Sequence, residues 1–80
     1  MALELEPHVP SPPFPVEILD IGDTEVANPF SGESCMLNPV AVAVYDMVKV
    51  AEMMQQYKVM RVGIDWFIEH YPAEYMVLLD

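Results

Sequence analysis

Basic residues are scarce in this sequence. Its 80 residues include three Lys and Arg against 13 Asp and Glu, and the formal net charge is -10. No Lys or Arg precedes Lys49. Nucleic acids and anionic membranes attract proteins through basic patches, which this composition does not supply. We therefore expect no nucleic-acid and no membrane partner, and any charged partner should be a basic protein surface.

Cysteine and glycine are scarce as well. Cys35 is the one cysteine, so the sequence has neither an internal disulfide nor a zinc-binding pattern. The three glycines are isolated, which excludes a glycine-rich phosphate loop. A catalytic nucleophile needs an adjacent base, and nothing in the sequence places His8 or His70 beside Ser34 or Cys35. We expect no enzyme, no cofactor and no metal site.

Long uncharged apolar runs are also missing, although 54% of the residues are hydrophobic. The most apolar stretch, 38–56, contains Asp46, Lys49 and Glu52 near its middle. Each such charge costs about 2.5–3.5 kcal/mol at the centre of a membrane helix, and a span needs about 20 apolar residues. The N-terminus has no basic start and no apolar segment of the secretory kind. We expect a cytosolic or particle-associated protein.

The stretch 38–56 predicts one long helix. Asn38 suits the N-cap, and Pro39 suits the first helical position. The polar positions recur at three- and four-residue steps and form one narrow stripe: Asp46, Lys49, Glu52, Gln55 and Gln56. Every other position is apolar, so most sides of this helix should be covered. A strand over 40–44 is the alternative, because valine is a mediocre helix former.

A second helix is predicted over 59–70, where Trp66 should be buried and Gly63 should allow close approach of the first helix. The residue before a proline avoids helical backbone, so Tyr71-Pro72 should end it. Pro72 can then start a short third helix over 73–79. A short strand over 75–79 is the alternative.

Residues 1–26 form a proline-rich arm. Five prolines fall within nine positions, which favours extended backbone. The arm is also rich in large apolar residues, unlike a disordered tail. We expect residues 12–21 to dock in extended form on a neighbouring copy or a partner, with Phe14 and Ile18 as anchors. A floppy acidic leader is the alternative, and 16–21 could also pair as a short strand.

Residues 27–38 are predicted to be a connector. Asn28-Pro29 and Ser31-Gly32 are turn signals. Asn28-Pro29-Phe30 also matches a tripeptide that some endocytic adaptor modules bind, but we expect Phe30 to fold against the helices. The sequence thus predicts an all-α fold, a small helical hairpin plus a short C-terminal helix in 39–80, with an extended Pro-rich N-terminal arm over 1–26.

Two short helices are too few to cover a helix this apolar, so we expect a homo-oligomer. The self-association face would contain Val40, Val44, Val48 and Ala51, or on the opposite side Val42, Tyr45 and Met53. Adding the arm, the predicted partner-binding residues are Phe14, Val16, Ile18, Leu19, Val40, Val44, Tyr45 and Val48.

Two segments, from Asn28 through Asp46 and from His70 through Asp80, resemble small uncharacterised proteins encoded by tailed bacteriophages. The resemblance implies a non-enzymatic viral protein located in the host cytoplasm or the virion. We therefore expect a protein–protein interaction module that is part of an assembly or binds a host protein. The alternative is an acidic inhibitor that mimics nucleic acid and blocks a basic groove.

Overall fold

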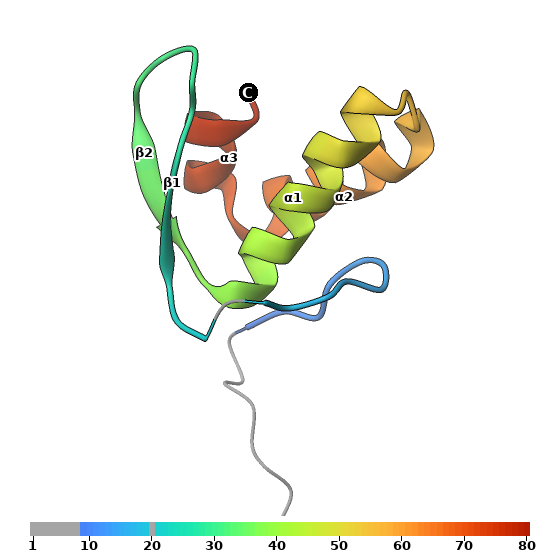
Figure 1. Cartoon of the computed structure of the whole chain (residues 1–80), viewed down its shortest axis with the longest axis horizontal. Coiled ribbons are helices and arrows are strands. Elements are labelled where there is room, and N and C mark those ends of the chain that lie inside the picture. Colours follow the sequence, from blue (N-terminus) through green and yellow to red (C-terminus); the bar gives the residue numbers. More distant parts are fainter. Residues whose placement is uncertain (1–8, 20) are drawn as a thin grey trace, which may run out of the picture.

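The structure is a computed structural model that describes residues 9–19 and 21–80. Two strands come first, and three helices follow them (Figure 1). The elements are β1 (Thr24–Ala27), β2 (Ser34–Leu37), α1 (Pro39–Met53), α2 (Tyr57–His70) and α3 (Pro72–Leu78). α1 packs along α2, and the β-hairpin packs beside α3 and the first turns of α1.

The expected all-α class is wrong, because β1 and β2 form an antiparallel two-stranded sheet. Thr24 pairs with Leu37, and Ala27 pairs with Ser34. Side chains alternate along each strand, so Val26 and Leu37 face inward while their neighbours are exposed. β1 begins inside the predicted arm and β2 inside the predicted connector. Four residues per strand are too few for this alternation to stand out in the sequence.

Asn28 organises the loop between the strands. Its side-chain oxygen accepts hydrogen bonds from the amide of Phe30 (2.8 Å) and the amide of Ser31 (3.4 Å). Its side-chain nitrogen donates to the Val77 carbonyl at 2.9 Å, which ties the loop to α3. Gly32 has a φ of 81°, which glycine adopts without strain. The expectation that Phe30 folds against the helices was wrong, since its side chain is 93% exposed.

α1 begins where the sequence predicted. The side-chain oxygen of Asn38 accepts from the amide of Ala41 at 2.9 Å, and Pro39 occupies the first turn. Asn38 also donates to the Tyr71 hydroxyl at 2.7 Å, which joins the start of α1 to the junction of α2 and α3. The helix ends at Met53, earlier than the predicted Gln56, and Gln55 has a positive φ of 59°. A left-handed residue of this kind commonly ends a helix.

α2 and α3 follow the sequence prediction closely. α2 ends at His70, before Pro72, and α3 begins at Pro72 as a helix instead of a strand. Trp66 is buried as predicted, and its ring meets Phe67 edge to face with centroids 5.2 Å apart. Gly63 lies where the helices approach, and a Cβ there would overlap Cγ2 of Val48.

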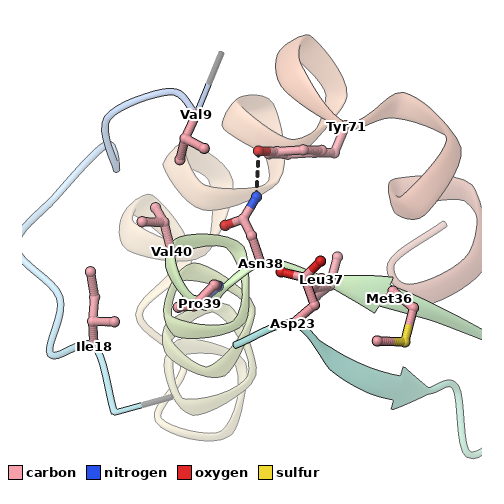
Figure 2. A pocket seen from close by; sticks show the side chains of 9 residues that line it. All are labelled: Val9, Ile18, Asp23, Met36, Leu37, Asn38, Pro39, Val40 and Tyr71. Carbon is pink, nitrogen blue, oxygen red and sulfur yellow. Dashed lines mark hydrogen bonds between the residues drawn. The ribbon is translucent and has the colours of Figure 1, made fainter. Parts of the chain in front are cut away.

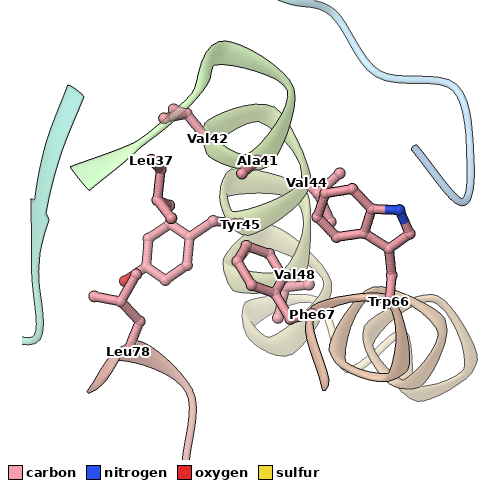
Figure 3. Packing of buried hydrophobic residues seen from close by; sticks show 9 residues of the cluster. All are labelled: Leu37, Ala41, Val42, Val44, Tyr45, Val48, Trp66, Phe67 and Leu78. Atoms are coloured by element: carbon pink, nitrogen blue, oxygen red, sulfur yellow. The ribbon is translucent and has the colours of Figure 1, made fainter. Parts of the chain in front are cut away.

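The core lies between α1, α2, β2 and α3, and all of its buried side chains are hydrophobic (Figure 3). Leu37 and Leu78 flank the Tyr45 ring on one side of α1, and Trp66 and Phe67 pack on the other side. The core residues are Leu37, Ala41, Val42, Val44, Tyr45, Val48, Trp66, Phe67 and Leu78. The hairpin therefore covers part of the α1 surface that the sequence prediction left open.

Candidate protein-binding surface

Residues 9–19, called the strap here, lie on the chain's own helices. The strap folds back on itself beside α1, with a bend at Pro13–Phe14 (Figure 1). The indole nitrogen of Trp66 donates to the Ser11 carbonyl at 2.7 Å. The Phe14 ring lies over Gly63, close enough to contact a Cβ placed there, at 3.4 Å. Val16 also packs against the core. The predicted anchor Phe14 is thus engaged within this chain.

Three predicted partner-binding residues of α1 lie in the core. Val44, Tyr45 and Val48 are buried by other parts of the same chain (Figure 3). A partner that meets the folded monomer cannot reach them. The sequence argument counted only the helices as possible cover. It missed the hairpin, which brings Leu37 onto α1, and it did not expect the strap to pack on its own chain.

The other predicted residues lie nearer to the surface. Ile18 and Leu19 are exposed where the strap leaves α1, and Ile21 beyond them is fully exposed. Val40 is half-buried near the start of α1. Large aliphatic side chains gathered on one surface are characteristic of a protein contact.

A cleft opens between the strap, the hairpin and the start of α1, and we call it the strap–hairpin cleft. Its volume is about 510 Å³. Val9 and Ile18 lie on one side of the α1 start, and Met36 of β2 lies on the other (Figure 2). The residues that line it are Val9, Ile18, Asp23, Met36, Leu37, Asn38, Pro39, Val40 and Tyr71.

The walls of the strap–hairpin cleft are fixed by the fold. The side-chain nitrogen of Asn38 donates to the Tyr71 hydroxyl, and its side-chain oxygen accepts from the Ala41 amide. The ring of Tyr71 packs beside Trp66 at a centroid distance of 5.4 Å. Among the described residues of the lining, Asp23 is the one that carries a carboxylate. The cleft therefore offers apolar side chains, with a single carboxylate among them.

Ile18 and Val40, two of the predicted partner-binding residues, line this cleft, whereas the sequence analysis did not select Met36 and Tyr71. Met36 alternates with inward-facing Cys35 and Leu37, so recognising β2 would have placed it on the outer side. No local sequence pattern indicates that Tyr71 lines the cleft, because its position depends on a contact with Asn38, which is 33 positions away.

The polar and charged side chains of the described residues lie at or near the surface, since none of them is buried. No three of the described His, Cys, Asp and Glu side chains could share a metal ion. Partial burial and the nearby Glu74 carboxylate raise the pKa of the Cys35 thiol. The thiolate is the reactive form, so this environment makes Cys35 a poor nucleophile.

The comparisons with protein-family models, with curated proteins and with solved structures found no match for this chain. In the part of the chain that the structure describes, no helix has the length and apolar character needed to cross a membrane.

Proposed function

We propose that this chain is a non-enzymatic protein–protein interaction module and that a partner protein binds in the strap–hairpin cleft. The observation that carries this proposal is the cleft itself, a concave apolar surface with exposed Ile18 on one rim and exposed Met36 on the other. Burying one large aliphatic side chain is worth about 1.5–3 kcal/mol. A partner that inserts an apolar side chain into the cleft would bury that side chain and would also cover the rim. Such a contact can be specific.

The charge of the chain defines the partner further. Asp23 lies in the cleft wall, Glu17 precedes Ile18, and the net charge is -10. A partner with an apolar anchor and a basic rim would fit this surface, because opposite charges at the rim speed association and suppress wrong partners. We also propose that the partner is a bacterial host protein or a virion protein. The support for this is the resemblance of the two segments to small phage proteins.

Nucleic-acid mimicry has less support. A mimic needs a dense, aligned row of carboxylates, and the described carboxylates are spread over the strap, β1 and all three helices. Examples are Glu17 on the strap, Glu25 on β1, Asp46 on α1, Asp65 on α2 and Glu74 on α3. The apolar cleft is the more specific feature, so the interaction module is our conclusion.

Photo-crosslinking tests the proposal. A photoreactive phenylalanine analogue replaces Met36 at the cleft in one protein and Ile68, an exposed apolar residue of α2, in the control protein. In bacterial lysate, the Met36 protein should give a defined adduct that excess unlabelled protein prevents. Ile18→Asp in the Met36 protein should abolish that adduct.

Identical adducts from both positions, or an adduct that Ile18→Asp leaves unchanged, would contradict binding in the cleft. Far-ultraviolet circular dichroism of each variant shows whether the helices are retained. This control separates a lost contact from a lost fold.

A further inference from the structure

A second apolar surface lies on the side of α1 that faces away from the core. Ala43, Met47, Val50 and Met54 follow each other at steps of four, three and four positions, so they share one face of the helix. We call them the outer strip. Val50 is 46% exposed and Met54 is 64% exposed, while Ala43 and Met47 are half-buried. The strip spans about 16 Å along the helix axis.

Neighbouring apolar residues extend the outer strip at both ends. Leu19 of the strap, which is 76% exposed, shares a hollow with Ala43, and Glu17 and Asp46 also line this hollow. At the other end, Val59 of α2 shares a hollow of about 200 Å³ with Met47, Val50 and Met54. An apolar surface therefore runs from the strap to the turn between α1 and α2, separate from the strap–hairpin cleft.

The spacing of the outer strip is that of a two-helix seam. Steps of four and three residues bring successive apolar side chains to one line, where they pack between those of a facing helix. The core of the monomer uses the opposite face of α1, where Ala41 and Tyr45 are buried. The fold of the single chain therefore does not account for the outer strip.

We infer that a second copy of this chain covers the outer strip, with its α1 antiparallel. The steps of four, three and four are the same in both directions, so an antiparallel copy can match every position of the strip. Ala43 then lies opposite Met54 of the second copy, and Met47 lies opposite Val50. Small side chains facing long ones allow the two surfaces to interdigitate.

The distribution of charge favours the antiparallel direction over the parallel one. All three basic residues, Lys49, Lys58 and Arg61, lie in the C-terminal half of α1 or the first turns of α2. Lys49 pairs with Glu52 and Arg61 pairs with Asp65 on their own helices, so Lys58 carries the excess positive charge of this end. The strap end of the molecule carries Glu17 and Asp23. An antiparallel pair places the strap end of one copy beside the turn end of the other, whereas a parallel pair would place like charges together.

Analytical ultracentrifugation of the purified full chain tests the dimer. The unmodified protein should sediment as a dimer that dissociates on dilution. Val50→Glu should weaken dimerisation more than about tenfold, because it buries a carboxylate in the seam. Ile68→Glu is the matched control, since Ile68 is also 46% exposed but lies on α2 away from the strip. This control should dimerise normally.

A monomer at several hundred micromolar would overturn the inference, and so would equal weakening by both variants. Circular dichroism checks that each variant keeps its helices. Because this experiment uses the protein alone, its result is independent of the cross-linking at Met36. Either proposal can therefore be contradicted while the other stands.

Disulfide trapping tests the orientation in a Cys35→Ser background. A mixture of Ala43→Cys and Met54→Cys proteins should give a mixed disulfide dimer, because an antiparallel pair brings these positions together. Each protein alone should give little, because its cysteines would lie about 16 Å apart, beyond disulfide reach. Dimers formed by each protein alone, or no mixed dimer, would overturn the antiparallel arrangement.

Discussion

The inner and outer faces of α1 are both apolar, yet they differ in what covers them. Val48 on the inner face is 2% exposed, under α2 and the Phe14 region of the strap. Val50, two positions later on the outer face, is 46% exposed. The two valines have the same chemistry, so their difference lies in the surrounding fold. Apolar character thus predicts that a surface needs cover, but it does not identify the cover.

The largest expected loss of stability comes from a substitution in the core that covers the inner face. Trp66→Ala removes a buried ring from the α2 side of the core and also loses the hydrogen bond to the Ser11 carbonyl. The free energy of unfolding should fall by about 3–5 kcal/mol, which is a large part of the stability of a domain this small. Urea unfolding followed by circular dichroism measures it. A loss below about 1 kcal/mol would show that the core is organised differently.

The second-largest loss of stability is expected at the close contact between α1 and α2. Gly63→Ala places a methyl group against Cγ2 of Val48, which is buried and cannot move freely. Overpacking of this kind costs about 1–3 kcal/mol, more than the roughly 0.5–1 kcal/mol that alanine gains over glycine in a helix. Thermal unfolding should therefore show a lower midpoint. Gly22→Ala is the matched control, because the space around Gly22 is open, and it should be close to neutral.

The start of α1 should show an intermediate effect. Asn38→Ala removes the cap on Ala41 and the bond to the Tyr71 hydroxyl, and we expect a loss of about 1–2 kcal/mol in the free energy of unfolding. Tyr71→Phe removes only the second bond and should cost about 0.5–1.5 kcal/mol. Urea unfolding of both variants separates the two contributions. Equal losses would mean that the cap on Ala41 contributes nothing.

The smallest effect is expected on the outer face. Val50→Ala should change the unfolding free energy of the monomer by less than about 0.5 kcal/mol, since the side chain is half exposed and alanine is the better helix former. Val44→Ala, on the inner face, should cost clearly more. Urea unfolding at protein concentrations too low for dimers compares them. Similar losses of unfolding free energy in the two variants would contradict the difference in burial between the two faces.

Local chemistry in the sequence determined where α1 begins, where α2 ends and where α3 begins. Asn38 and Pro39 start α1, Pro72 separates α2 from α3, and the polar stripe of α1 follows helical spacing. The burial of Trp66 and the close approach at Gly63 were also predictable, because a large aromatic and a helical glycine have few other uses in so short a chain. The helix boundaries depend on residues within a few positions of each other, whereas the residues that cover Trp66 and Gly63 are distant in the sequence.

The tertiary structure alone decided the β-hairpin, the docking of the strap and the face of α1 that remains open. The hydrogen bond from Asn28 to Val77 spans 49 positions, and the one from Trp66 to Ser11 spans 55. Each strand has only four residues, and the strap has no regular period. Their positions follow from the apolar surface that the packed helices leave uncovered, and that surface exists only once the chain has folded.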